Sequence, residues 1–216
     1  MSLSRRPNPS VEPGLAPRQQ LRKELLRWRE SMPSEQNIAL ANRIGQQLAR
    51  AVSSVLLSVF ESTKRTAKDL CIGVYWPIRG EPDLRGYYAA LTDTGYSLAL
   101  PFLKTDPING KSNIILSYAN WAVGDPTMPG KYGIEQPELL IEVIPDLILA
   151  PCVGFDAHGY RLGYGAGYFD RTLSQRPTQT IGIAFAQTQV DDLHPSSSDV
   201  KLNAILTEFG THFFAD

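Results

Sequence analysis

Two adjoining stretches decide how this sequence is interpreted: "PDLILAP" (145–151) and "FDAHGYRLGYGAGYFDR" (155–171). The first is a short apolar run, which is typical of a buried strand. The second contains four glycines and passes into "YFDRTLSQ" (168–175), which has the pattern of a helix. A loop between a strand and a helix is a common ligand site in α/β folds, because backbone N–H groups and the helix N-terminus point out together. The sequence therefore predicts an α/β fold with a ligand site at this loop.

The rest of the chain extends this alternation. A helix is predicted from Pro17, where Leu21, Leu25 and Trp28 form one apolar stripe. Further helices are predicted over residues 34–60 and 81–95, and strands over residues 69–76, 96–101, 113–119, 180–186 and 203–208. The turn-rich residues 124–138 are long for a simple connection, which suggests a function. Strands that alternate with helices favour a layered fold with a largely parallel sheet.

The totals indicate an ordinary globular protein. The 216 residues are 43% hydrophobic and carry a formal net charge of -1, so nothing attracts the chain in bulk to nucleic acid or an anionic membrane. Residues 1–16 lack periodicity and are predicted to be a flexible tail, with residues 17–216 as a single domain. No apolar run approaches the ~18 residues that span a bilayer. Cys71 and Cys152 stand in apolar runs, as reduced thiols do. We expect a cytoplasmic monomer that acts on small molecules, without nucleic-acid or membrane partners.

The glycine loop has the chemistry of a phosphate site. Gly163, Gly165 and Gly167 alternate as an anion-binding nest requires, because glycine accepts positive φ and lets a phosphate touch successive N–H groups. The spacing fits neither the Walker A nor the dinucleotide-binding pattern. Arg161 could offset phosphate charge, and Asp170 could hold a divalent ion beside it. The alternative is a tight turn in which Arg161 and Asp170 form a salt bridge.

The first predicted helix is basic on the side that borders its apolar stripe. Arg18, Arg22 and Arg29 fall on that side at 3.6 residues per turn. Cations beside a buried face can reach a ligand in a cleft. The alternative is a basic face that is simply solvated.

A second strand-to-loop transition lies at "YWPIRGEPD" (75–83). There Glu81 could accept hydrogen bonds from an amino-heterocycle while Trp76 supplies apolar contact. The alternative is that Glu81 and Asp83 serve the N-terminus of the following helix. The three histidines have no metal-like spacing, and no G-x-S-x-G elbow supports acyl-enzyme chemistry. Phosphate and metal chemistry is therefore the favoured class.

Taken in order, these motifs resemble the 5-formyltetrahydrofolate cyclo-ligase family, also called methenyltetrahydrofolate synthetase, over residues 18–208. The family signature F-D-x-x-G-x-R-L-G-x-G-x-G-Y-Y-D-R is matched by residues 154–171, with Phe169 where tyrosine is usual. Three further stretches are similar to parts of the family. "YWPIRGEPD" (75–83) is similar to its strand with an E-x-D turn, and "KYGIEQPE" (131–138) to its G-I-x-E-P segment. "LRKELLRWRESM" (21–32) is similar to its basic first helix.

The resemblance implies a three-layer α/β/α fold with a mostly parallel central sheet, similar to that of sugar-phosphate isomerases and CoA transferases. It implies that 5-formyltetrahydrofolate and ATP, with Mg²⁺, become 5,10-methenyltetrahydrofolate, ADP and phosphate. The formyl oxygen is a poor leaving group until it is phosphorylated, after which N10 attacks the carbon and phosphate departs. The alternative is a protein of the same fold that binds nucleotide or folate without turnover.

The resemblance also implies roles for individual residues. The positions that match ATP contacts are Arg18, Arg22, Arg161, Leu162, Gly163, Tyr164, Gly165, Ala166, Gly167, Tyr168 and Phe169. The positions that match folate contacts are Trp76, Glu81 and Tyr168. Those that match magnesium ligands are Asp170 and Asp199. Those that match catalytic groups are Arg161, Tyr168 and Asp170. The family commonly has lysine where Arg18 stands, so the charge is kept while the donor geometry changes.

Overall fold

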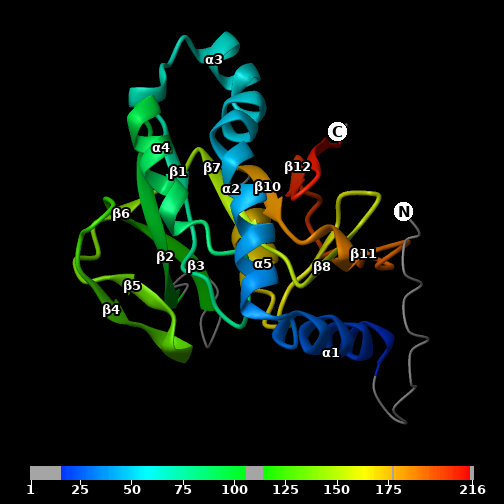
Figure 1. The fold of residues 1–216 in the computed structure, drawn as a ribbon. Helices are drawn as coiled ribbons and strands as arrows, with labels where there is room; N and C mark the ends of the chain where they lie inside the picture. Colours follow the sequence, from blue (N-terminus) through cyan, green and yellow to red (C-terminus); the bar gives the residue numbers. More distant parts are fainter. Residues whose placement is uncertain (1–15, 106–113, 177, 215–216) are drawn as a thin grey trace.

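A mixed β-sheet with helices on both faces forms the body of the molecule (Figure 1). The structure, a computed structural model, describes residues 16–105, 114–176 and 178–214. The predicted flexible tail, residues 1–16, falls outside this description except for Ala16. The layered α/β/α architecture predicted from the sequence is confirmed.

The inner strands of the sheet run parallel. Across the sheet, the described strands are β13 (Gly210–Phe213), β12 (Ala204–Thr207), β10 (Gln179–Ile183), β7 (Leu147–Pro151), β1 (Cys71–Gly73), β2 (Ser97–Thr105), β3 (Ile114–Asn120) and β6 (Glu142–Val143). Neighbours from β12 to β2 pair in parallel, whereas β13, β3 and β6 are antiparallel additions at the edges. Because both faces of β7 are covered, its residues 147–150 are all buried, and this explains their continuous apolar sequence.

The order of the parallel strands reverses between β1 and β7. From β1 the chain proceeds to β2 on one side, and β7, β10 and β12 then follow one another on the other side. In open α/β sheets, ligands bind in the crevice outside the carboxyl ends of strands at such a reversal. The segments that follow Gly73 and Pro151 are therefore placed to form a site.

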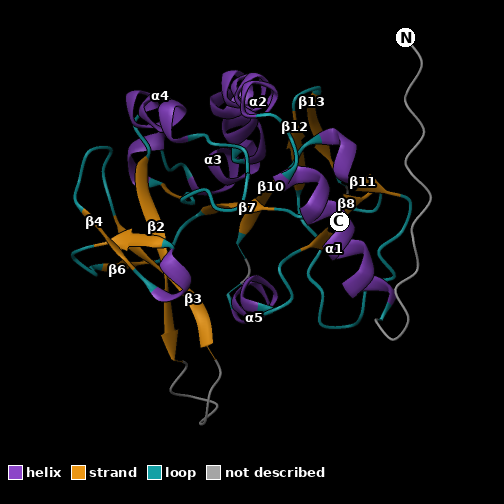
Figure 2. Ribbon diagram, turned by 60° about the horizontal axis from the view of Figure 1, so that its bottom comes forward, coloured by secondary structure: helices purple, strands orange, loops and turns teal. Residues whose placement is uncertain are grey.

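Helices complete the layers. The described α-helices are α1 (Pro17–Glu30), α2 (Ser34–Val55), α3 (Leu57–Thr63), α4 (Tyr88–Thr94) and α5 (Tyr168–Gln175). Figure 2 shows α2 and α4 over one face of the sheet and α5 on the other. The long helix α2 buries Ile44, Leu48 and Val52 at intervals of four residues, against β10 and β12. Each such side chain contributes about 1.5–3 kcal/mol of burial free energy.

The helix α1 packs against a small second sheet, and its Trp28 also reaches the main core at Phe185. This sheet contains β11 (Gln189–Val190), β8 (Gly154–Asp156) and β9 (Arg161–Leu162). Leu26 of α1 shares a buried cluster with Val153 and Leu162. Part of the glycine-rich stretch is thus a hairpin of β8 and β9. The packing of α1 on this small sheet places the basic first helix near the carboxyl end of β7.

Several predicted boundaries were wrong. The predicted helix over residues 34–60 is split at Leu56, which stays fully buried in the core. Of the predicted strand over residues 69–76, only β1 (Cys71–Gly73) forms a strand, and Leu70 and Val74 beside it each add one backbone hydrogen bond to β2. The predicted helix over residues 81–95 starts as a 3₁₀ turn at Arg85, because Asp83 holds the preceding turn by accepting a hydrogen bond from the Arg85 N–H (3.1 Å).

Short polar strands were not predicted. Residues 124–138 contain a hairpin of β4 (Thr127–Pro129) and β5 (Glu135–Pro137), and β13 returns alongside β12 through a turn at Gly210. These strands contain proline or lack alternating apolar residues, so the sequence pattern gives no strand signal. Of the described helices, none has the length and apolar character needed to cross a membrane.

Candidate active site

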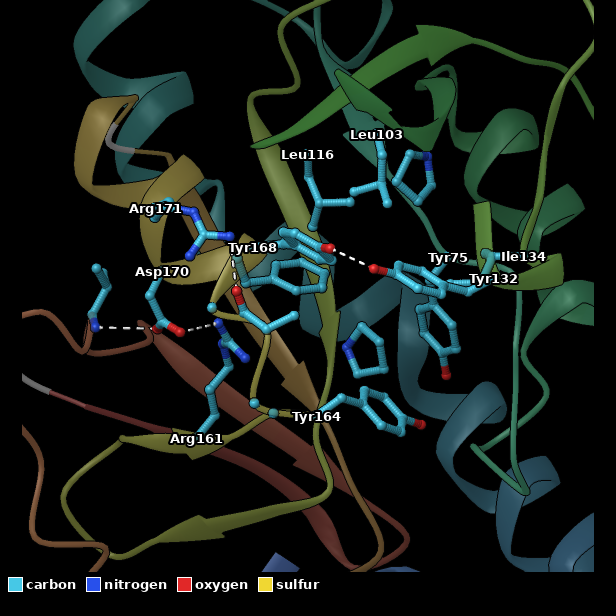
Figure 3. Close-up of a pocket in the computed structure, with 18 of the residues that line it drawn as sticks. Tyr75, Leu103, Leu116, Tyr132, Ile134, Arg161, Tyr164, Tyr168, Asp170 and Arg171 are labelled. Atoms are coloured by element: carbon cyan, nitrogen blue, oxygen red, sulfur yellow. Dashed lines mark hydrogen bonds and ion pairs between the residues drawn. The ribbon is translucent and has the colours of Figure 1, made fainter. Parts of the chain in front are cut away.

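A cavity of about 680 Å³ opens at the carboxyl ends of β1 and β7. Its walls come from α1, from the segment that follows β1, and from the strands β2 and β3 themselves. The β4–β5 hairpin, the glycine loop with α5, and residues 196–200 complete them. Figure 3 shows part of this lining. The topology brings together predicted residues that are far apart in sequence, namely Arg18, Arg22, Trp76, Glu81, Arg161, the 163–170 segment and Asp199.

The glycine loop forms one wall. Gly165 and Gly167 have positive φ, 99° and 66°, as the nest prediction requires. Gly163 does not, and its carbonyl instead accepts a hydrogen bond from Arg22 Nε at 2.7 Å. Gly167 directly precedes α5, so the N-terminus of that helix adds a favourable dipole for an anion. The backbone here suits an anionic ligand.

Arg161 is a buried cation beside this loop. Its side chain is 3% exposed, and Nη2 lies 3.0 Å from Asp170 Oδ2, so the salt bridge considered as an alternative is present. Within the described chain, however, Nε and Nη2 make no well-directed hydrogen bond. The guanidinium also lies over the Phe169 ring, 4.8 Å from its centroid. Buried donors without a well-directed hydrogen bond are rare, which marks this guanidinium as a functional candidate.

Two basic residues of α1, Arg18 and Arg22, face the cavity. Arg18 makes a bidentate ion pair with Asp199, at 2.7 and 3.0 Å, and the Ser196 N–H and hydroxyl donate to the same carboxylate. The Arg18 guanidinium holds the pKa of the Asp199 carboxyl well below its usual range. Burial, with Arg18 nearby, lowers the pKa of Arg22. The solvated-face interpretation of this helix is therefore wrong for Arg18 and Arg22.

Glu81 lies at the opposite end of the cavity. It is 4% exposed; its Oε2 accepts from the Ile78 N–H at 2.9 Å, and its Oε1 from the Tyr164 hydroxyl at 2.6 Å. Burial raises the pKa of Glu81, and the hydrogen bonds oppose this effect. The helix α4 begins at Tyr88, seven positions later, so Glu81 does not cap it. Asp83 does not cap α4 either; it accepts a hydrogen bond from the Arg85 N–H at the start of the 3₁₀ turn that precedes this helix.

Apolar side chains line the space between these ends. They belong to the strand ends and the hairpin: Trp76, Phe102, Leu103, Leu116 and Ile134. Trp76 packs edge-on against Trp121, with ring centroids 6.3 Å apart, and Arg85 lies 4.7 Å from its ring centroid. Such an apolar chamber, with few polar groups around it, suits a flat heterocyclic ligand.

Tyr168 marks the meeting of the two ends. Its hydroxyl lies 2.9 Å from that of Tyr132 in the β4–β5 hairpin, as Figure 3 shows. Tyr132 has an unusual φ of 62°, and Lys131 beside it also lines the cavity. These two hairpin residues were not predicted to be in the site. The signal available in the sequence was the length of the turn-rich stretch over residues 124–138.

One predicted nucleotide residue lies outside the cavity, whereas both predicted magnesium ligands lie in its wall. Leu162 does not line the cavity, because its fully buried side chain packs into the core beneath α1. Asp170 and Asp199 do line it, but the described chain contains no cluster of three or more histidine, cysteine or acidic residues for a metal ion. Two carboxylates can still serve Mg²⁺, which typically takes its other ligands from water and substrate phosphates.

Both cysteines are free thiols. Cys152 is buried behind the cavity, and burial raises its pKa to about 12. Because only the thiolate is a good nucleophile, this thiol is unreactive at neutral pH.

Comparison with known proteins agrees with this geometry. A sequence model of the 5-formyltetrahydrofolate cyclo-ligase family matches residues 15–208. The 5-formyltetrahydrofolate cyclo-ligase of Haemophilus influenzae is 29% identical, with 88% of this chain and 96% of that protein covered. The enzyme of the same name from Mycolicibacterium smegmatis is 27% identical, with 87% and 92% covered.

A solved structure shows the same fold. The NMR structure of Aquifex aeolicus 5,10-methenyltetrahydrofolate synthetase superimposes with a TM-score of 0.69 at 26% identity, covering 92% of this chain and 93% of that one. The chain therefore belongs to the 5-formyltetrahydrofolate cyclo-ligase family.

Proposed function

We propose that this protein is an ATP-dependent ligase that cyclises 5-formyltetrahydrofolate to 5,10-methenyltetrahydrofolate with release of ADP and phosphate. The observation that carries the proposal is one cavity with two chemically different ends. The glycine loop, with the buried Arg161 and the half-buried Arg18 and Arg22, forms one end, and Glu81 beside the apolar chamber forms the other. The reaction needs such a cavity, because a polyphosphate must meet a folate ring.

The cationic end would hold the triphosphate of ATP. Arg161 pairs with Asp170 but has N–H groups that make no well-directed hydrogen bond, and Arg18 and Arg22 supply two more guanidinium groups from α1. Backbone N–H groups at Gly165 and Gly167 would add donors without steric obstruction. Hydrogen bonds between cations and phosphate oxygens are short and strong, and Arg side chains can make them in pairs.

The apolar end would hold the folate ring. Glu81 would accept hydrogen bonds from ring N–H groups, and Trp76 would pack against the ring. The Tyr168 hydroxyl, between the two ends, could hydrogen-bond either ligand. This arrangement would bring the formyl oxygen toward the γ-phosphate.

The chemistry asks the protein for alignment and charge stabilisation rather than for a nucleophile. The formyl oxygen attacks the γ-phosphorus and ADP leaves. N10 then attacks the activated carbon, the phosphate departs with the former formyl oxygen, and the N10 proton is lost. The positive charges of Arg161 and Arg18 would stabilise the transferring phosphoryl group.

Mg²⁺, when bound, would neutralise phosphate charge during transfer, and we propose Asp170 as its protein ligand. Asp170 Oδ1 has only a long contact, 3.5 Å, with the Val200 N–H, so it retains acceptor capacity. Asp199 as a second ligand stays a prediction, since both of its oxygens already accept hydrogen bonds from Arg18. A cytoplasmic location and a monomeric state also stay predictions.

A direct assay separates this proposal from a non-catalytic binding protein. The purified protein is mixed with 5-formyltetrahydrofolate, Mg²⁺ and ATP, and the near-ultraviolet absorbance of methenyltetrahydrofolate is followed. We expect growth that requires ATP and is lost in Asp170→Asn. A flat trace from folded protein that still binds ATP would favour the non-catalytic alternative.

A further inference from the structure

Behind the cavity, Arg29 is a fully enclosed arginine in α1. It is 2% exposed and does not line the cavity. Its Nε donates to the carbonyl of Arg79 at 3.0 Å, and its Nη1 donates to the carbonyl of Cys152 at 3.2 Å. Its Nη2 donates to the Tyr164 hydroxyl. Three segments thus fix the guanidinium in one orientation.

Tyr164 connects this arginine with the folate end of the cavity. Its backbone belongs to the glycine loop, but its side chain projects away from Arg161 and Asp170 (Figure 3). The hydroxyl accepts from Arg29 and donates to Glu81 Oε1 at 2.6 Å. The prediction that Tyr164 serves the nucleotide therefore does not describe where its side chain points.

We infer that Arg29 and Tyr164 are positioning residues, which hold the Glu81 carboxylate in one orientation to receive the N–H groups of the folate ring. The inference rests on the proposed function for its ligand. It assigns a role at the folate end to a side chain whose backbone lies in the nucleotide loop. The chain Arg29–Tyr164–Glu81 would then act as a unit.

The physical need for such a chain follows from the burial of Glu81. Removing a carboxylate from water favours its neutral form, and a neutral carboxyl is a weaker acceptor. The charged groups that face it are Arg29 from α1 and Arg79 from its own loop. The other titratable groups around it are those of Tyr164, Tyr75, Tyr88 and Cys152. Apart from the Ile78 N–H, the hydroxyl of Tyr164 is the direct donor to the carboxylate, and Arg29 polarises that hydroxyl.

The variant Tyr164→Phe tests the inference, because it keeps the ring that lies beneath Arg29 and Arg79 and removes only the hydroxyl. We expect the KM for 5-formyltetrahydrofolate to rise about tenfold at neutral pH, as for a lost hydrogen bond to a charged group. We expect the KM for ATP to change less than about twofold. The acid limb of kcat/KM for the folate should move to higher pH, since Glu81 would lose a stabiliser of its charged form.

Two controls make the test specific. Tyr160→Phe removes a hydroxyl four residues earlier and should leave both KM values and the pH profile unchanged. In a Glu81→Gln background, Tyr164→Phe should have little further effect, because the two residues act together. Arg29→Lys, if folded, should shift the profile in the same direction as Tyr164→Phe.

The outcomes are distinct. Equal rises in both KM values, an unmoved pH profile, or full additivity with Glu81→Gln would overturn the positioning role while leaving the cyclo-ligase intact. If the wild type binds 5-formyltetrahydrofolate without turnover, calorimetric Kd values for the same variants replace KM and decide the same question. Failure of the wild type to bind this folate would overturn both the inference and the proposed function.

Discussion

Replacing Gly165 with alanine isolates the part that the glycine loop plays in ATP binding. The φ of 99° at this position is one that L-residues rarely adopt, so the change should cost about 1–2 kcal/mol of unfolding free energy. The new Cβ would also lie 3.3 Å from Arg22 Cζ, a tight contact at the phosphate end of the cavity. If it displaces one phosphate hydrogen bond, ATP affinity should fall about 10- to 100-fold.

A matched variant separates backbone strain from ligand contact. Gly124 has nearly the same φ, 97°, but its added Cβ would meet nothing within 4 Å, and it does not line the cavity. Gly124→Ala should therefore lower the Tm as Gly165→Ala does, without changing the Kd for ATP. Thermal denaturation and isothermal titration calorimetry measure the two effects. The reasoning fails if folded Gly165→Ala binds ATP as the wild type does, or if Gly124→Ala weakens ATP binding equally.

Three further predictions follow from individual contacts. The ion pair with Arg18 lowers the pKa of Asp199, so it stabilises the protein above about pH 4 and loses this effect as the pH falls. Arg18→Ala should therefore lower the free energy of unfolding by about 1 kcal/mol at pH 7, as measured by urea unfolding. A loss of unfolding free energy that does not shrink toward low pH would contradict this. Asp170→Asn should reduce kcat about 100-fold or more with an unchanged KM for the folate; a raised folate KM instead would place Asp170 at the other end of the cavity. Cys152 should resist iodoacetamide in the native protein at pH 8, because burial raises its pKa to about 12, and it should react after unfolding. Mass spectrometry measures the labelling. Rapid labelling of the native protein would show that the thiol is exposed and would contradict the prediction.

The sequence pattern predicted the elements that have one dominant physical signal. Within the predicted strand over residues 145–151, β7 (Leu147–Pro151) is apolar because it is covered on both faces, and it pairs in parallel with β10, whose residues 180–183 are also buried. The edge strand β13 and the β4–β5 hairpin were missed because their residues are exposed or polar, so only their tertiary hydrogen bonds reveal them. Local pattern therefore describes the core better than the rim, and the rim supplies part of the site.

Site residues show a similar division. The glycine spacing predicted positive φ at Gly165 and Gly167, and the structure has positive φ at both. This prediction was possible because the backbone conformation of a glycine turn depends on neighbouring residues in the sequence. The approach of Tyr164 to Glu81 joins residues 83 positions apart, and the strand order brings them together. Sequence alone left two interpretations of Glu81, and only the observed start of α4 excludes helix capping. Tyr132 carried no residue-level signal at all.

The measurement that tests the central claim most directly follows the formyl oxygen itself. 5-Formyltetrahydrofolate labelled with ¹⁸O in its formyl group is incubated with the protein, Mg²⁺ and ATP, and the released phosphate is analysed by mass spectrometry. If the formyl oxygen attacks the γ-phosphorus, each methenyltetrahydrofolate formed should be matched by one ADP and one phosphate that carries the label. Unlabelled phosphate, or methenyltetrahydrofolate formed without ADP, would contradict the account.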